Sequence, residues 1–351
     1  MSVSPVHQQV HDLFAGQVYL VGGAVRDYLL GREVVDYDFA TPLPPAEVEA
    51  IVRRSGRRPY LVGKRFGTVG FRVPVANGYQ YIEVTTYRQE SYTPGSRKPE
   101  VEFTGDLELD LSRRDFTINA MALGVDGTLW DPFGGQADLE AGVIRAVGQP
   151  KARFREDPLR ILRAVRFATR YDFELEESTA RHIRSMRFEL LHVSRERWVQ
   201  ELDKLLTEAH VKRGLHLLMD LGLWTVLIPD LTLQQEYDQN SAYHDSTLFE
   251  HTTRVVENVP REKLDLRWAA LLHDLAKPFV ATSNKRGRTN YLRHELLGAS
   301  LAEDVSRRLK FSNQRRQFII ETITTHLTPD SPLKAYDDAG KKRLDGASTL
   351  E

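Results

Sequence analysis

The chain has 351 residues, and its 48 lysines and arginines nearly balance its 49 aspartates and glutamates, for a formal net charge of −1. With a net charge this close to zero, the protein as a whole does not attract nucleic acid electrostatically. A nucleic-acid partner would therefore need a local basic surface. No run of about 18 apolar residues occurs, which excludes a membrane-spanning helix. The absence of cysteine excludes a disulfide partner and thiolate metal sites.

A chain of this length exceeds one ordinary hydrophobic core, so we expect two or three domains. The N-terminus lacks a basic segment followed by an apolar one, which argues against a secretory signal. We therefore expect a cytoplasmic location.

The first patterned segment, Val18–Thr41, predicts a strand, a glycine turn, a short helix and a second strand that carries Asp36 and Asp38. Side chains at positions i and i+2 of a strand share a face, so the two carboxylates should point the same way. Such a pair repels unless hard cations lie beside it. The spacing predicts a Mg²⁺ site for a phosphate-bearing ligand.

The glycine turn precedes this pair. Gly22 and Gly23 would let the backbone approach a ligand closely, and the helix after them would offer free N–H groups to a triphosphate. Arg26 would add a fork-shaped donor for phosphate oxygens. We predict nucleotide binding at this turn.

Further along, Pro45–Ser55 predicts a helix, and the alternating segments Tyr60–Val75 and Tyr79–Tyr87 predict a pair of strands. Glu83 on the second strand has two equally open interpretations, a third carboxylate of the metal site or a solvent-facing residue. The polar segment Arg88–Pro99 predicts a mobile loop.

The segments GGAVRD and DYDFAT resemble the signature of polymerase-beta-like nucleotidyltransferases, in particular the bacterial class that includes CCA-adding tRNA nucleotidyltransferases and poly(A) polymerases. Within Asp110–Leu123, which we expect to be a helix capped near Ser112, RRDFTINA is similar to a second block of this family. The resemblance implies contacts to the triphosphate and ribose of the nucleotide from Arg114, Asp115 and Asn119.

A third block lies in Phe154–Asp172, for which we expect one helix with arginines at every third position. Its EDPLR resembles the family's EDxxR element, in which protein side chains replace a nucleic-acid template. A carboxylate can accept from the exocyclic amine shared by C and A, and a guanidinium can donate to ring acceptors. The implied roles are base selection by Asp157 and Arg160, orientation of Arg160 by Glu156, and phosphate contact by Arg163 and Arg166.

The C-terminal part carries four histidines in or beside expected helices, one of them followed directly by an aspartate. This pattern resembles the HD phosphohydrolase superfamily, which binds one or two divalent metals and activates water. The resemblance implies a divalent transition-metal site. An inert HD fold kept for RNA docking also stays open. The candidate ligands are His251, His273, Asp274, His294 and His326.

These features predict an α+β fold. We expect a polymerase-beta-like catalytic head with a mixed sheet at residues 1–145, a helical neck and body at 146–230, a helical HD domain at 231–335 and a frayed polar tail at 336–351. Within the body, Arg195–Leu206 is the clearest amphipathic helix. The resemblance implies an enzyme that adds CMP and AMP from CTP and ATP to tRNA 3′ ends without a template. We expect phosphoryl transfer with two Mg²⁺ ions and release of pyrophosphate.

Narrower activities stay open, namely CC-only, A-only and poly(A) addition. The loop Arg88–Pro99 has full length, and in the family a loop here is implicated in the switch to adding A, which favours an enzyme able to add A.

An alternative of another class is an HD phosphohydrolase whose head only binds tRNA. The intact Asp36 and Asp38 pair and the EDPLR segment argue against it, and a regulator without catalysis would require a lost metal ligand.

Overall fold

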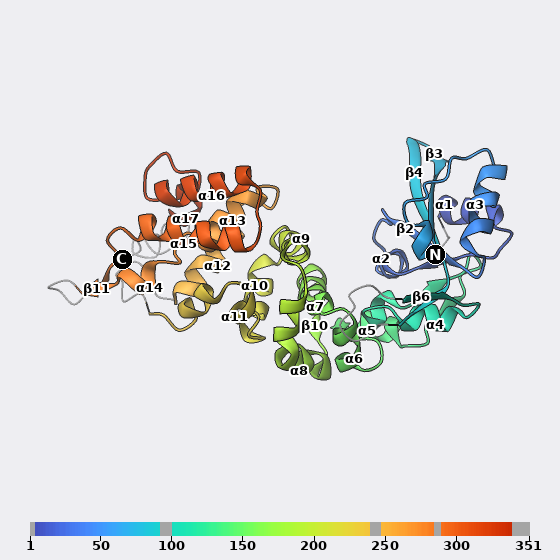
Figure 1. Ribbon diagram of the computed structural model, residues 1–351, viewed down its shortest axis with the longest axis horizontal. Coiled ribbons are helices and arrows are strands. Elements are labelled where there is room, and N and C mark those ends of the chain that lie inside the picture. The colour runs from blue at the N-terminus through green and yellow to red at the C-terminus, as the bar shows by residue number, and fades with distance from the viewer. Residues whose placement is uncertain (1–3, 92–99, 239–246, 284–288, 339–351) are drawn as a thin grey trace, which may run out of the picture. The chain divides into compact units, whose positions relative to one another are not determined.

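The computed structural model describes residues 4–91, 100–238, 247–283 and 289–338. The chain forms two compact units (Figure 1), one of Met1–Asp157 with Glu174–Thr179 and one of Pro158–Phe173 with Ala180–Glu351. We call them the head unit and the helical unit and describe each by itself. The predicted α+β class is confirmed, because the large sheet lies in the head unit and helices dominate the other.

A six-stranded mixed sheet forms the centre of the head unit. Its strands, in spatial order, are β3 (Thr68–Val75), β4 (Gly78–Thr86), β2 (Tyr37–Thr41), β1 (Tyr19–Val21), β7 (Ala122–Leu123) and β8 (Leu129–Trp130). Strands β2 and β4 are parallel, whereas β3 and β4 form the predicted antiparallel hairpin. The first strand of that hairpin starts later than predicted, because the chain before Thr68 includes a short 3-10 turn, η1 (Lys64–Phe66).

Helices and minor strands surround this sheet. The remaining elements of the head unit are α1 (Pro5–Leu13), α2 (Gly23–Leu29), α3 (Pro45–Arg54), β5 (Arg88–Ser91), β6 (Glu100–Phe103), α4 (Leu107–Ser112), η2 (Thr117–Asn119), α5 (Gly135–Ala141), β9 (Val143–Ile144), α6 (Pro150–Glu156) and β10 (Glu174–Leu175). The predicted strand–turn–helix–strand order of the first segment is confirmed as β1, α2 and β2.

The two faces of the sheet differ chemically. On one face, side chains such as Phe39 on β2 and Val84 on β4 are buried in a hydrophobic cluster with residues of α1 and α3, which lie beside β2, β3 and β4 in Figure 1. Because strand side chains alternate, the sequence neighbours Asp38 and Glu83 emerge on the opposite face. Burial of the apolar face thereby fixes which side chains the other face presents.

The predicted helix over Asp110–Leu123 is wrong. Helix α4 begins earlier, where the Asp106 carboxylate caps two backbone N–H groups, and it ends at Ser112. The chain then turns through η2 into β7. Asp115 accepts a hydrogen bond from the Phe116 N–H at 2.8 Å, and such local side-chain bonds compete with helix formation.

Two other predicted segments are divided differently from our expectation. The single helix expected over Phe154–Asp172 is two helices, since Pro158 lacks an N–H and biases Asp157 toward an extended backbone, with φ −142° and ψ 99°. The segment predicted as the loop Arg88–Pro99 begins as strand β5, paired with β6. Residues 92–99 of that prediction lie outside the described residues.

The helical unit contains successive amphipathic helices, as predicted. Its elements are α7 (Leu159–Tyr171), α8 (Glu177–Met186, whose first residues belong to the head unit), η3 (Arg187–His192), α9 (Arg195–Leu206), α10 (Val211–Asp220), α11 (Trp224–Leu227), η4 (Pro229–Gln234), α12 (Leu248–Asn258), α13 (Leu264–Leu272), α14 (Lys277–Val280), β11 (Thr282–Ser283), β12 (Thr289–Asn290), α15 (His294–Arg308), α16 (Asn313–Thr325) and α17 (Lys334–Asp338).

Helix α9 coincides with the helix predicted from its amphipathic pattern, and it is tied to the helices that follow. Asp203 on α9 accepts from the Trp268 indole N–H at 2.7 Å and from Arg315 at 2.9 Å. These bonds connect α13 and α16 to α9 within the helical unit.

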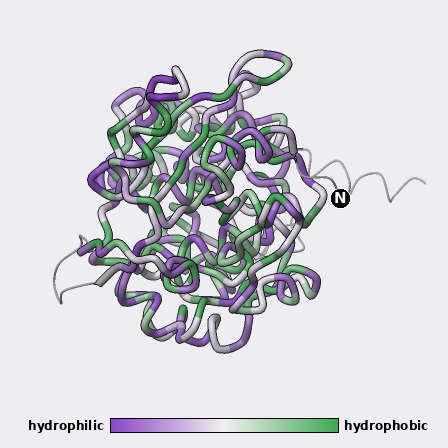
Figure 2. The backbone as a smooth tube through the Cα atoms, turned by 90° about the vertical axis from the view of Figure 1, so that its right-hand side faces the viewer, coloured by the Kyte–Doolittle hydropathy of each residue, from purple (hydrophilic) through white to green (hydrophobic). Residues whose placement is uncertain are grey.

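Hydrophilic and hydrophobic residues alternate along the backbone (Figure 2), as amphipathic elements require. Among the residues that the structure describes, no helix combines the length and the apolar character needed to cross a membrane.

Candidate active site and metal centre

Three carboxylates gather on the open face of the head sheet. The register of β2 and β4 pairs Asp38 directly with Glu83, and neighbouring strands lie about 4.8 Å apart. Asp36, one residue before β2, is exposed like Asp38 and is separated from it by one residue. The structure therefore brings Glu83, which the sequence left open, beside the predicted pair.

The electrostatics of Asp38 reflect this crowding. Although part of its side chain is exposed, surrounding groups desolvate the carboxyl and raise its pKa, and the negative charges of Glu83 and Asp36 act in the same direction. The positive charge of Arg114 opposes them. A divalent cation would relieve the repulsion, and an all-oxygen ligand set of this kind suits Mg²⁺.

The glycine turn lies against two guanidinium groups. A Cβ added at Gly22 would stand 2.8 Å from Nη1 of Arg114, and one added at Gly23 would stand 3.1 Å from Nη2 of Arg26. Gly22 also has a φ of +67°, a conformation that side-chain-bearing residues rarely adopt. The absence of side chains at this turn thus allows both arginines to approach the backbone beside the carboxylates.

Arg26, predicted as a donor to phosphate oxygens, is engaged within the head unit. It is only 5% exposed, and its guanidinium donates to Oδ1 of Asn119 at 2.6 Å and to the Asp27 carboxylate at 3.0 Å. Asn119 in turn donates to Oδ1 of Asp115 at 3.0 Å. Three predicted nucleotide-binding residues therefore form one network, in which Arg26 holds Asn119 in place.

Asp110 is a residue of this site that our sequence analysis missed. Its buried carboxylate pairs with Arg113 at 2.9 Å and with Arg114 at 3.2 Å, and it accepts from the Arg88 N–H at 3.2 Å. Burial alone would raise the pKa of Asp110, but the charges of Arg114 and Arg113 outweigh it and lower the pKa. The signal for this contact in the sequence is that Asp110 lies three and four residues before Arg113 and Arg114, a spacing at which side chains can pair.

The residues predicted to select the base lie on both sides of the division between the two units. In the head unit, Glu156 accepts from Nη2 of Arg153 at 2.5 Å, and Asp157 ends α6 in an extended conformation. In the helical unit, Arg160 is buried near the start of α7. Arg153 also donates to the Ser112 carbonyl at 2.8 Å, so α6 is fixed to the end of α4.

The two arginines predicted to contact phosphate differ in their surroundings. Arg166 is buried, and its Nε lies 2.6 Å from Oε2 of Glu201 on α9. Arg163 is less buried, with 3.9 Å between its Nη1 and Oε1 of the same carboxylate. The shared partner Glu201 joins α7 to α9, and Arg166 points into that contact.

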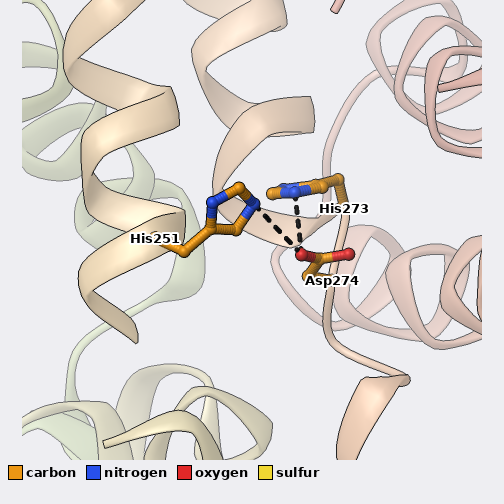
Figure 3. Close-up of side chains that lie close together, drawn as sticks. All are labelled: His251, His273 and Asp274. Carbon is orange, nitrogen blue, oxygen red and sulfur yellow. Dashed lines mark ion pairs between the residues drawn. The ribbon is translucent and has the colours of Figure 1, made fainter. Parts of the chain in front are cut away.

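A second cluster gathers in the helical unit around Asp274. Oδ2 of Asp274 lies 3.0 Å from Nε2 of His273 and 3.4 Å from Nε2 of His251 (Figure 3), and 2.7 Å from Nζ of Lys277. Burial would raise the pKa of Asp274, but the charges of His273 and Lys277 and the hydrogen bonds of His251 and His273 hold it well below its ordinary value. These neighbours therefore favour the charged form of this buried carboxylate.

Two more of the predicted histidines complete the cluster. Nε2 of His294 lies 3.5 Å from Oδ1 of Asp274 and 3.1 Å from Nε2 of His326. Burial and the charge of His273 lower the pKa of His326 to about 4. The five predicted side chains thus form two groups of potential metal ligands that share Asp274.

The ring orientations in this cluster suit a cation. Nδ1 of His273, His294 and His326 each lies 2.6–2.7 Å from a backbone carbonyl, which can only accept, so each Nδ1 donates. In a neutral ring the inward Nε2 then carries a lone pair. Nε2 of His294 and Nε2 of His326 lie 3.1 Å apart beside the Asp274 carboxylate, an arrangement that a metal ion would stabilise.

Asp337 is the second residue that the sequence analysis missed, because we predicted a frayed tail from residue 336. Helix α17 instead includes Asp337, whose buried Oδ1 lies 3.3 Å from Nε2 of His251. Burial would lower the pKa of His251, but the bonds to Asp274 and Asp337 outweigh it and raise the pKa. The rest of the predicted tail, 339–351, lies outside the described residues.

Comparison with known proteins identifies the family. Three family models match the chain: "Poly A polymerase head domain" at residues 18–145, "Probable RNA and SrmB- binding site of polymerase A" at 172–234 and "HD domain" at 247–346. A solved structure of the CCA-adding enzyme of Bacillus stearothermophilus in complex with CTP is 30% identical, covers 98% of this chain and 83% of that one, and superposes with a TM-score of 0.61. The chain belongs to the CCA-adding enzyme family. The predicted resemblance is confirmed.

Curated relatives agree with this membership. The CCA-adding enzyme of Geobacillus thermodenitrificans is 42% identical over 269 residues, which are 75% of this chain and 61% of that protein. The CCA-adding enzyme of a Geobacillus species is 45% identical over 212 residues, 60% of this chain and 50% of that protein. The chain thus spans between half and two thirds of the length of these curated relatives.

Asp110→Asn should destabilise the head unit by about 3 kcal/mol at pH 7, because it leaves two arginines beside a buried neutral amide. The folded-state pKa of Asp110 is lowered, so the wild type has this stabilisation above pH about 4 and loses it as the pH falls through the folded-state pKa. Urea titrations between pH 7 and pH 3 should show the two proteins converging. The exposed-site control Asp12→Asn should cost much less, because surface ion pairs contribute little to stability, and equal losses from both variants would contradict the assignment.

Proposed function

We propose that this chain adds CMP and AMP to the 3′ ends of tRNA from CTP and ATP, so that the CCA sequence is completed without a template. The observation that carries the proposal is the register that sets Glu83 beside Asp38, with Asp36 and Arg114 nearby, in a member of the CCA-adding enzyme family. Relatives that share 42% and 45% of aligned residues bear that activity in their names.

In the proposed reaction, the 3′-hydroxyl oxygen of the RNA attacks the α-phosphorus of the nucleotide. A new P–O bond forms, the bond to the β-phosphate's bridging oxygen breaks, and pyrophosphate leaves. Asp36 and Asp38, with Glu83 as a third carboxylate, would hold Mg²⁺. When bound there, this ion lowers the pKa of the attacking hydroxyl and neutralises phosphate charge.

Arg114 and Asn119 have distinct proposed roles. Arg114 lies against the glycine turn and would neutralise charge that builds on the leaving pyrophosphate. Asn119, held by Arg26 and Asp115, would bond to the ribose. We propose that Arg26 acts by positioning Asn119, because its own guanidinium is engaged by Asp27 and Asn119.

For base selection we propose Asp157 and Arg160, with Glu156 orienting Arg160. A carboxylate and a guanidinium complement the edge that C and A share, whereas G and U present an edge that such a pair repels. Arg163 would contact phosphate. Arg166 would support this segment through its buried pairing with Glu201, which stabilises the position of α7.

A second activity is supported by the Asp274 cluster. We propose that His251, His273 and Asp274, with His294 and His326, bind a divalent transition metal and serve as a phosphohydrolase site. The supporting observation is the set of buried Nε2 atoms and carboxylate oxygens that gather around Asp274, since a cation would stabilise such a group. When bound, the metal would supply an activated water.

The first test uses tRNA that lacks its 3′ end, incubated with CTP alone, ATP alone or both, followed by sequencing of the products. We expect CCA only when both nucleotides are present. Asp38→Asn should lower the rate by on the order of 10³-fold, since metal-based stabilisation is worth several kcal/mol, while the fold remains intact because a repulsion is removed.

The exposed-residue control Glu47→Gln should keep normal activity. Near-normal addition by Asp38→Asn would refute the role of the carboxylates. Addition of CC without A would favour a CC-only enzyme, addition of A alone to tRNA that already ends in CC an A-only enzyme, and long A tails on unrelated RNA a poly(A) polymerase.

The second test concerns the Asp274 cluster. Asp337→Ala should weaken binding of Mn²⁺ or Ni²⁺ by the full chain about 10- to 100-fold in calorimetry, because it removes the buried partner of His251. It should also lower hydrolysis of a phosphodiester reporter, while nucleotide addition stays unchanged. Asp330→Ala, an exposed aspartate just before α17, is the matched control. Equal metal binding by both variants would rule out the role of Asp337, and a wild-type chain that binds neither ion would rule out this metal site.

A further inference from the structure

A hollow of about 540 Å³ lies on the open face of the head sheet. Its volume falls within the range of about 300–1,000 Å³ that is usual for small-ligand sites. We call it the tyrosine hollow. Its lining includes Tyr60, Phe66, Gly70, Tyr81, Glu83 and Arg88.

The tyrosine hollow is continuous with the carboxylates. Glu83 lines it and is paired in register with Asp38 on one side and with Gly70 of β3 on the other. Tyr81 precedes Glu83 by two residues on the same face, and its hydroxyl donates to Oε1 of Glu83 at 3.3 Å. The hollow therefore starts one strand away from Asp38.

Two tyrosine rings form part of its apolar surface. The rings of Tyr60 and Tyr81 have centroids 5.8 Å apart and an interplanar angle of 62°. They are 38% and 42% exposed, so neither is simply part of the core. Partly exposed aromatic rings of this kind offer a surface on which single-stranded RNA bases can stack.

A glycine makes this arrangement fit. A Cβ at Gly70 would stand 2.1 Å from the Tyr81 hydroxyl oxygen, so only glycine at this position of β3 lets the Tyr81 ring lie where it does. Thr68 and Gly70 line the hollow from the same strand. The ring position is therefore a specific feature of the hairpin.

Positive charge surrounds the rings. The Arg72 guanidinium lies 5.8 Å from the Tyr60 ring centroid, and that of Arg65 lies 4.5 Å from the Phe66 centroid. Arg88 lines the hollow itself and donates to the Phe66 carbonyl. Aromatic faces with arginines around them suit a nucleotide, whose base stacks while its phosphate pairs with a cation.

We propose that the tyrosine hollow binds the 3′-terminal nucleobase of the RNA primer, stacked against Tyr60 and Tyr81, so that the ribose 3′-hydroxyl of the same nucleotide reaches Asp38 and Glu83. This inference rests on the proposed function and identifies the binding site for the 3′ end of its RNA substrate. The terminal base changes after each addition. Stacking accepts any base, whereas hydrogen-bond recognition of one base would not.

The test is steady-state kinetics with the full chain, varying tRNA that lacks its 3′ end against saturating CTP, and then CTP against saturating tRNA. Tyr60→Ala should raise the KM for tRNA about 5- to 100-fold and leave the KM for CTP unchanged. Tyr60→Trp, which keeps a stacking surface, should restore the KM for tRNA.

The matched control is Tyr79→Ala. Tyr79 lies two residues before Tyr81 on β4, is 73% exposed and is not part of the lining of the hollow. Its loss should change neither KM. Tyr81→Phe should retain most of the affinity for tRNA, since the ring remains.

Each other outcome has a defined meaning. A rise in the KM for CTP instead of tRNA would place the incoming base in the hollow and overturn the inference, as would unchanged constants for Tyr60→Ala. A wild-type chain that adds no nucleotide to tRNA contradicts the proposed function itself. If the wild type is active and the Tyr60 variants leave both KM values unchanged, only the inference is contradicted.

Discussion

The mutual repulsion of carboxylates on the open face of the head sheet is the interaction around which the head unit is organised. Asp38 and Glu83 lie side by side because β2 and β4 are parallel and in register, and that register is set by the buried side chains of the opposite face. A slip of either strand by one residue would turn its carboxylate into the core. Packing on one face thereby maintains an unfavourable charge arrangement on the other, which suits a site that gathers cations and phosphates.

The rest of the head unit supplies positive charge at fixed positions around this site. Asp110 orients Arg114, and the Arg26–Asn119–Asp115 network closes the other side of the glycine turn. The helical unit holds a comparable arrangement around Asp274, where backbone carbonyls fix three histidine rings. In both units, buried secondary interactions determine which polar atoms face one another.

Local pattern predicted much of this structure. Alternation and glycine placement gave β1, α2, β2 and the β3/β4 hairpin, and amphipathic spacing gave α9. The missed features depend on contacts between distant residues: the strand register beside Asp38, the burial of Asp110 and the contact of Asp337 with His251. Pro158 in the sequence indicates the break between α6 and α7. We predicted one helix there because the arginines recur at every third position.

The most direct test of the central claim is a crystal structure of the full chain with CTP and Mn²⁺ in place of Mg²⁺, with the ion located by its anomalous scattering. The account predicts an ion bound between the carboxylates of Asp36 and Asp38 and the triphosphate, near Glu83. An ion bound elsewhere, with the side chains of Asp36 and Asp38 directed apart, would contradict it.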